Sequence, residues 1–319
     1  MSNIAFIFPG QGSQKVGMGK DLFDKFEEAR AVYAEASDAV GSDIAKLCFE
    51  GPEDVLNLTE NTQPAILTTS LAALSVLGAM HIEPGAVAGH SLGELTAVSA
   101  AGGLTVGQAA SLAKRRGGYM QEAAPKGRGL MAAVLGLPAD KVMEACKEAS
   151  AVGVVSPANF NSPEQVVIAG EKEAVLKASA ICQEMGAKRV VPLAVSVPSH
   201  CMLMKPAAER LKTDLDDAGI RDLDVPLAAN ATGRFISSAS DVREMLVAQL
   251  TSPLLWVDCI RTIVDEGTTT VVEVGPGKVL SGLVKRIARE VEVRNVEDES
   301  TLNATLDYIG MGCKMPPKK

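Results

Sequence analysis

A serine flanked by glycines is the residue whose setting points most directly to chemistry. Residues 89–93 have the sequence Gly-His-Ser-Leu-Gly, which matches the pattern Gly-x-Ser-x-Gly. An apolar run precedes it at 86–88, and a helix-favouring segment follows at 94–101. In this setting the serine lies on a tight strand-to-helix turn, and amides at the helix N-terminus can stabilise negative charge on a substrate oxygen. The motif therefore predicts acyl transfer through an ester on Ser91.

Whether Ser91 is a nucleophile or only caps the following helix depends on a partner base. The chain has 3 histidines. His81 lies where a helix would end and is predicted to be structural. His90 adjoins the serine, so its side chain should point away and pack or form a hydrogen bond. His200 lies in the loop Ser-Val-Pro-Ser-His at 196–200, where a base is expected, although an ordinary exposed histidine would have the same sequence context.

An acidic residue that could orient His200 is not evident. In the α/β-hydrolase order an aspartate or glutamate lies between the serine and the histidine. No acid between 91 and 200 occupies a convincing strand-end position. A histidine held by a neutral group is a weaker general base than one backed by a carboxylate. We hypothesise that such a site favours a thiol nucleophile over water.

Other polar residues could complete an acyl-transfer site. The loop at 9–14, Pro-Gly-Gln-Gly-Ser-Gln, follows a predicted strand but fits neither phosphate-loop template. We predict instead that the amides of Gln11 and Leu92 form an oxyanion hole. Arg116, on a predicted helix, is either a solvated surface residue or a bidentate clamp for a substrate carboxylate. Gln249, near a predicted helix end, could equally be a surface residue.

Composition indicates a globular protein with few options for unusual chemistry. The 319 residues suffice for roughly two domains, and 47% are hydrophobic and 22% charged. The formal net charge of −8 argues against general nucleic-acid binding. The 6 cysteines show no Cys-x-x-Cys spacing, so no metal site is predicted and a reducing compartment fits. We expect no signal peptide, a buried helix rather than a membrane span at 64–80, and a cytoplasmic protein.

Alternating strands and helices predict a parallel α/β sheet for most of the chain. Strands are expected at 4–8, 87–89, 226–229 and 270–274. Helices are expected at 22–40, 64–80, 93–101, 105–122, 242–250 and 256–266, with an amphipathic stripe at 279–287.

The middle of the chain has a different pattern. Strands are expected at 130–137, 152–160, 165–170 and 189–195, with helices at 139–150 and 171–186 and a turn at 161–164. This βαββαβ order is that of a ferredoxin-like unit. The sequence therefore predicts a large α/β domain from 1–126 and 198–319, interrupted by a small ferredoxin-like domain at 127–197.

Taken together, the motifs resemble the malonyl-CoA:acyl-carrier-protein transacylases of bacterial fatty acid synthesis. The resemblance spans residues 4 to about 305 and is carried by six segments in order. These are Phe-Pro-Gly-Gln-Gly-Ser-Gln at 8–14, Gly-His-Ser-Leu-Gly-Glu at 89–94, Arg-Gly at 116–117, Ser-Pro-Ala-Asn-Phe-Asn-Ser-Pro at 156–163, Val-Ser-Val-Pro-Ser-His-Cys at 195–201 and Glu-Val-Gly-Pro-Gly at 273–277.

The resemblance implies a fold and a set of catalytic roles. The fold would be an α/β-hydrolase-like core that carries a ferredoxin-like domain, with the site in the cleft between them. By position, Ser91 matches the nucleophile and His200 the general base and acid. The main-chain carbonyl of Gln249 matches the group that holds this histidine, which would explain the missing acid.

The resemblance also implies residues that bind the substrate. The amides of Gln11 and Leu92 match the oxyanion hole, and Arg116 matches the arginine that pairs with the free carboxylate of the malonyl group. Asn161 and Asn230 fall in motif segments near the site and are assigned to substrate binding without a more specific role.

Malonyl-CoA and acyl carrier protein are the implied partners, with no metal, nucleotide or other bound cofactor and with neither nucleic acid nor membrane. The carrier protein is acidic in this family, so docking would need a local basic patch. Candidates are Lys114 with Arg115, Lys188 with Arg189, and the group Lys285, Arg286 and Arg289. Two alternatives stay open: a serine thioesterase or hydrolase with a related core, and a carrier-protein scaffold with a vestigial site.

Overall fold

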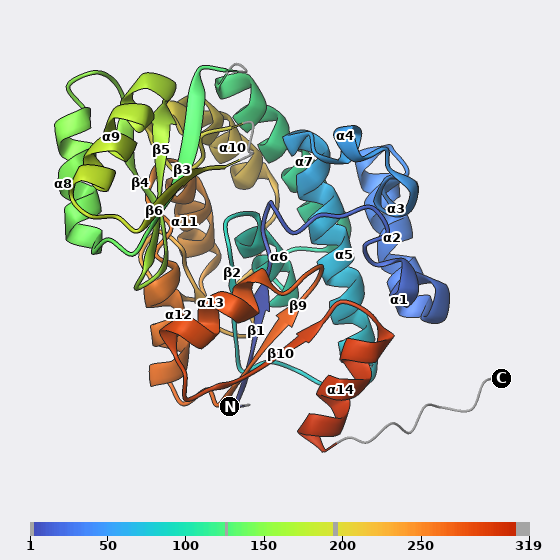
Figure 1. Cartoon of the computed structure of the whole chain (residues 1–319). Helices are drawn as coiled ribbons and strands as arrows, with labels where there is room; N and C mark the ends of the chain where they lie inside the picture. Colours follow the sequence, from blue (N-terminus) through green and yellow to red (C-terminus); the bar gives the residue numbers. More distant parts are fainter. Residues whose placement is uncertain (1–2, 125–126, 194–196, 311–319) are drawn as a thin grey trace.

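Two β-sheets of different size form the framework of the molecule (Figure 1). The computed structural model describes residues 3–124, 127–193 and 197–310. The larger sheet has the strand order β10-β9-β1-β2-β7-β8, and the smaller has the order β4-β5-β3-β6. Parts of both predicted domain junctions lie outside the described residues.

The larger sheet is parallel except at one edge. Its strands are β1 (Ile4–Phe8), β2 (Ala86–Gly89), β7 (Leu227–Ala228), β8 (Phe235–Ile236), β9 (Thr270–Val274) and β10 (Glu292–Val296). Central β1 pairs in parallel with β2 and β9, and only β8 pairs antiparallel. Alternate residues of β1 enter separate cores on the two faces, Phe6 and Phe8 on one and Ala5 and Ile7 on the other. Burial on both faces explains the continuous apolar run of this strand.

Helices cover both faces of the larger sheet. One core takes apolar residues from α1 (Lys20–Lys25), α2 (Glu27–Val40), α3 (Ile44–Glu50), α4 (Glu53–Leu56), α5 (Thr59–Ala79), α6 (Leu92–Ala100), α7 (Val106–Ala123), α10 (Lys205–Asp217), α11 (Ala239–Thr251) and α14 (Glu299–Ile309). The other takes residues from α12 (Trp256–Asp265) and α13 (Val279–Ile287). Among the described residues, only α5 is long and apolar enough to cross a membrane, but 78% of that stretch is buried within the protein. It is a core helix.

The smaller sheet is antiparallel and lies beside the larger one (Figure 1). Its strands are β3 (Gly129–Leu135), β4 (Val155–Ser162), β5 (Gln165–Glu171) and β6 (Arg189–Pro192), with α8 (Ala139–Ala149) and α9 (Lys172–Glu184) on one face. The chain order βαββαβ and the neighbour order of the strands are those of a ferredoxin-like unit. The predicted fold class is confirmed.

The opposite face of this small sheet turns toward the rest of the protein. Met131 and Val167 on that face share an apolar cluster with Cys201. Main-chain bonds join β4 to the segment after α11: Phe160 donates to the carbonyl of Leu254, at 2.9 Å, and Leu254 donates to the carbonyl of Ala158, at 2.8 Å. Residues far apart in the sequence therefore meet where the two sheets adjoin.

Several elements differ from the sequence-based prediction. The predicted helix 22–40 is two helices, because Phe26 takes an extended conformation between them and Arg30 donates to the carbonyl of Phe23 at the end of α1. Helix α5 begins at Thr59 rather than at Pro64, so the proline lies inside the helix, in its second turn, and leaves one helical hydrogen bond unmade. Strand β4 runs into the predicted turn at 161–164. Helices α3, α4, α10 and α14 and strands β8 and β10 were not predicted.

Candidate active site

Ser91 lies on the sharp turn between β2 and α6, with φ 55° and ψ −107°. The flanking glycines permit that turn: a Cβ on Gly89 would overlap the main chain of Gly93, and a Cβ on Gly93 would overlap the carbonyl of Phe8. The Ser91 side chain forms no capping hydrogen bond with α6. Its hydroxyl is therefore directed to another partner, which argues against the capping alternative.

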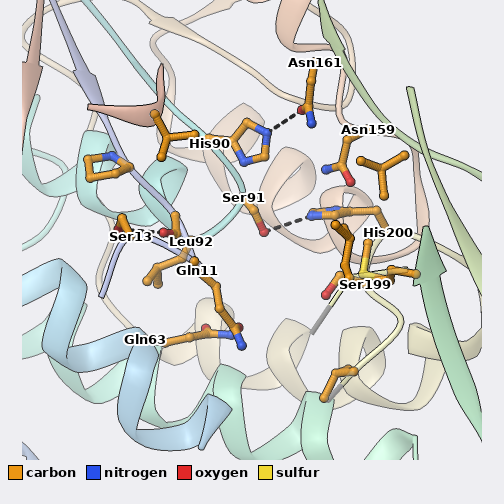
Figure 2. A pocket seen from close by; sticks show the side chains of 18 of the residues that line it. Gln11, Ser13, Gln63, His90, Ser91, Leu92, Asn159, Asn161, Ser199 and His200 are labelled. Carbon is orange, nitrogen blue, oxygen red and sulfur yellow. Dashed lines mark hydrogen bonds between the residues drawn. The ribbon is translucent and has the colours of Figure 1, made fainter. Parts of the chain in front are cut away.

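That partner is His200, 109 residues further along the chain. The Ser91 hydroxyl oxygen lies 2.8 Å from Nε2 of the imidazole (Figure 2). On the other side of the ring, Nδ1 lies 2.8 Å from the main-chain oxygen of Gln249. A carbonyl only accepts, so Nδ1 must carry the proton. Nε2 is then unprotonated and can accept the serine proton.

Burial keeps this imidazole neutral. His200 is 2% exposed, and burial lowers its pKa from 6.5 to about 3. The hydrogen bond to Gln249 opposes that shift, while the positive charge of Arg116 and the nearby His90 ring add to it. A neutral histidine is the form in which Nε2 can act as a base.

Arg116 reaches the same serine from α7. Its Nη2 donates to the Ser91 hydroxyl oxygen at 3.3 Å and to Oε1 of Gln249 at 2.7 Å, and its Nη1 donates to Oε1 of Gln63 at 2.8 Å. The side chain is buried, and burial lowers its pKa to about 10, against the effect of the Glu94 charge. Arg116 therefore stays cationic near neutral pH, and the alternative of a solvated surface arginine is wrong.

Buried polar side chains hold the serine turn from behind. Asn230 accepts the Ser91 amide at 2.9 Å through Oδ1 and donates to the Gly89 carbonyl at 2.8 Å. Gln249 donates through Nε2 to the Ser91 carbonyl at 2.9 Å. The Ser91 amide and the Gly89 carbonyl thus have partners, as burial requires. Asn230 is fully buried and is not among the described residues that line the cleft, so its position argues for holding the turn rather than for the predicted substrate binding.

His90 points away from the serine, as its position in the motif predicts. Its Nε2 lies 2.8 Å from Oδ1 of Asn161 on β4 (Figure 2). Its ring packs edge-on against Trp256, with centroids 5.4 Å apart. Burial lowers the pKa of His90, so the ring is neutral. This contact joins the serine turn of the large sheet to the small sheet.

A cleft of about 210 Å³ opens in front of Ser91, between the two sheets. Met131, Val167 and Asn161 of the small sheet line one side of it. The loop that carries His200 lines it as well. From the large sheet it is lined by the loop at 9–13 together with Leu92, Arg116 and α13. Gln11 lies in this lining, and its side-chain amide donates to the hydroxyl of Thr59 at 3.3 Å. No group of three or more metal-ligating side chains occurs among the described residues.

These features have counterparts in known proteins. Residues 5–304 match the model of the acyl transferase domain. The malonyl CoA-acyl carrier protein transacylase of Bacillus subtilis is 44% identical over 310 residues, covering 97% of this chain and 98% of the relative. That of Escherichia coli K12 is 44% identical over 308 residues, covering 96% and 100%. This chain belongs to the malonyl CoA-acyl carrier protein transacylase family.

Solved structures of the transacylase family share the whole fold. The transacylase of Xanthomonas oryzae superimposes with a TM-score of 0.94 at 43% identity, covering 97% of this chain and 98% of that one. A malonyl-transacylase solved in complex with a type II acyl-carrier protein gives a TM-score of 0.94 at 44% identity, with coverage of 96% and 100%. The resemblance expected from the sequence is confirmed.

Two residues of this transacylase site were missed by sequence reasoning. Gln63 supplies an acceptor to Arg116 from the second turn of α5, and no local pattern indicated it. Glu94 lies in the motif itself, yet no role was assigned to it. Its charge in a segment that carries no other charged residue was the available signal.

Proposed function

We propose that this protein moves a malonyl group from malonyl-CoA to the phosphopantetheine thiol of an acyl carrier protein, through an ester on Ser91. The observation that carries the proposal is the convergence on one hydroxyl of a neutral imidazole nitrogen, from His200, and a buried guanidinium, from Arg116. The imidazole can take a proton, and the guanidinium can pair with the carboxylate that distinguishes malonyl from acetyl. The activities named for the relatives support the same reaction.

In the first half-reaction the Ser91 oxygen attacks the thioester carbonyl while Nε2 of His200 takes its proton. The carbonyl oxygen becomes an oxyanion, for which the amides of Gln11 and Leu92 are the proposed donors. Both residues line the cleft, and Leu92 is the first residue of α6. Collapse of this intermediate breaks the carbon–sulfur bond, and Nε2–H returns the proton to the departing coenzyme A thiolate.

The second half-reaction reverses these steps with a different thiol. Nε2 of His200 takes the proton of the phosphopantetheine thiol, and the sulfur attacks the malonyl-serine ester. Breaking the carbon–oxygen bond regenerates Ser91, which recovers its proton from His200. Thioester and ester are of comparable reactivity, so the cycle is expected to need no metal, nucleotide or other bound cofactor.

Arg116 supplies the selectivity in this proposal. When an acyl group without a carboxylate fills the cleft, the guanidinium loses contact with water and gains no charged partner, which costs binding free energy. The site therefore disfavours acetyl relative to malonyl. Gln63 and Gln249 fix the orientation of the guanidinium through its two terminal nitrogens. Asn161 lines the cleft and is retained as a proposed substrate contact, in addition to its bond with His90.

Transfer to a thiol rather than to water is favoured by the partner of the histidine. A neutral carbonyl stabilises an imidazolium less than a carboxylate does, so His200 is a weaker base, and a thiol is more easily deprotonated than water. We place the reaction in the cytoplasm, which fits the scattered free cysteines. The alternative function is hydrolysis by the same serine ester.

Intact-mass spectrometry after brief incubation with malonyl-CoA, then with phosphopantetheinylated carrier protein, tests the proposal. A malonyl adduct on Ser91 that moves to the carrier thiol is expected, and Ser91→Ala should form none. Decay of the adduct to free malonate with nothing on the carrier would identify a thioesterase. Absence of any adduct on the folded protein would refute the serine-ester mechanism.

A further inference from the structure

Glu94 is a fully buried carboxylate that the proposed reaction does not use. It lies in the first turn of α6, three residues after Ser91. Its Oε1 accepts the main-chain amide of Asn230 at 2.8 Å, and its Oε2 accepts Nε2 of Gln249. Both of its oxygens therefore face donors, and it has no contact with the cleft.

The amide of Gln249 links Glu94 to Arg116 in a chain of fixed direction. A guanidinium only donates and an ionised carboxylate only accepts. The Gln249 side chain between them must therefore direct Oε1 to Arg116, at 2.7 Å, and Nε2 to Glu94. With the amide in that orientation, Nε2 also donates to the Ser91 carbonyl at 2.9 Å.

We propose that Glu94 is a positioning residue for the recognition of carboxylated acyl groups. By accepting from Nε2, it keeps the oxygen of the Gln249 amide on Arg116 and so keeps the guanidinium beside the Ser91 hydroxyl. This inference rests on the proposed malonyl transfer. It assigns to Glu94 an effect on which acyl group is transferred, although Glu94 itself touches neither substrate nor the reacting atoms.

A glutamine at position 94 cannot replace the carboxylate, although it has the same shape. One oxygen and one NH₂ group would face two donors, the amide of Asn230 and Nε2 of Gln249. The main-chain amide cannot turn, so the mismatch falls on Gln249. In the present orientation, Nε2 of Gln249 would face the NH₂ group of the new glutamine, donor against donor. If the Gln249 amide rotated by 180° instead, its NH₂ group would face Arg116. In both cases Glu94→Gln weakens the hold on Arg116, whereas the shorter Glu94→Asp keeps an acceptor-only group.

The test compares malonyl-CoA with acetyl-CoA as donors for wild type, Glu94→Gln and Glu94→Asp. Acetyl carries no carboxylate, so steps common to both donors cancel in the ratio of kcat/KM values. Burial raises the pKa of Glu94 to about 7, so assays at about pH 8 keep it ionised. Rates are normalised to the Ser91 labelled by a fluorophosphonate. We expect the malonyl-to-acetyl ratio to fall by roughly tenfold or more in Glu94→Gln and by less in Glu94→Asp.

Two outcomes would overturn the inference. One is an equal loss of kcat/KM with malonyl-CoA and acetyl-CoA, which would mean that Glu94 only supports the serine turn. The other is a ratio closer to wild type in the isosteric Glu94→Gln than in Glu94→Asp, which is what simple filling of space predicts. If Glu94→Gln does not fold, Glu94→Asp decides by the same comparison of donors. A wild type that forms no malonyl-serine would refute the proposed function instead, so the two failures are distinguishable.

Discussion

Nδ1 of His200 lies 2.8 Å from the main-chain oxygen of Gln249, a residue within the last turn of α11. Carbonyls in the last turn of a helix have no partner within that helix, so this oxygen is free to accept from the imidazole. The C-terminal end of the helix also carries partial negative charge, which stabilises an imidazolium. A helix end thus occupies the place that an aspartate has in hydrolase triads, and no acidic residue is needed in the sequence.

The first prediction is that His200 stays neutral at moderately acidic pH. Burial lowers its pKa from 6.5 to about 3, so the folded protein should leave Nε2 unprotonated from about pH 8 to about pH 5. Imidazole ¹⁵N NMR, assigned by comparison with His200→Asn, would measure this directly. A titration midpoint above about pH 5 would contradict the prediction. In the unfolded chain the same imidazole binds its proton near pH 6.5. The folded state therefore keeps its full stability above pH 6.5 and loses stability as the pH falls from 6.5 toward 3, because protons bind the unfolded chain first.

The second prediction concerns Arg116→Ala. Removing the guanidinium should lower kcat/KM for malonyl-CoA by roughly a hundredfold or more and that for acetyl-CoA by much less, because only malonyl offers it a carboxylate. Arg116→Lys is the matched variant: it keeps the charge, but an ammonium cannot bond Gln63 and Gln249 in the same fork. We therefore expect Arg116→Lys to recover only part of the kcat/KM for malonyl-CoA that Arg116→Ala loses. Equal losses for the two donors in single-turnover acylation would show that Arg116 does not read the acyl group.

From the residues alone, only Ser91 lay in a motif whose chemistry was evident. The local contexts of His200 and Arg116 left their roles open, and the resemblance to a known family placed them in the same site. The order of strands and helices was also predictable, since it depends on apolar periodicity within short windows. The supporting contacts were not. That Asn230 holds the amide of Ser91, or that Gln249 bonds Arg116, follows from packing between segments more than a hundred residues apart. The break at Phe26 was not predictable from periodicity, because the helical pattern of apolar residues continues across it.

The third prediction tests the contact between the two sheets. Asn161→Ala removes the partner of a buried imidazole nitrogen, so the free energy of unfolding should fall by about 1–3 kcal/mol. Thermal unfolding of this variant, of His90→Phe and of the double variant would measure it. His90→Phe replaces the polar ring with an apolar one that can still pack on Trp256. We expect Asn161→Ala to lower the free energy of unfolding clearly less in the His90→Phe background than in wild type. If the losses of the two single variants instead add up to that of the double variant, the two side chains do not interact.

Of the three basic clusters suggested for carrier docking, the one that begins on α13 adjoins a helix that lines the cleft. Lys114 and Arg115 already have partners, the carbonyl of Val40 at 2.9 Å and the carboxylate of Asp214 at 3.1 Å. Helix α13 instead lines the cleft through residues of its first two turns, and Lys285 and Arg286 are exposed in its last turn. We therefore expect an acidic carrier to bind beside the helix that borders the cleft.

The fourth prediction follows from that placement. Charge reversal by Lys285→Glu with Arg286→Glu should raise the KM for carrier protein by roughly tenfold, because complementary charge steers association. Formation of malonyl-serine from malonyl-CoA should be unchanged, since that step does not involve the carrier. Lys141→Glu with Lys147→Glu is the matched control, because α8 lies on the face of the small sheet away from the cleft. An unchanged KM for the α13 variant, or an equal rise in the control, would place docking elsewhere.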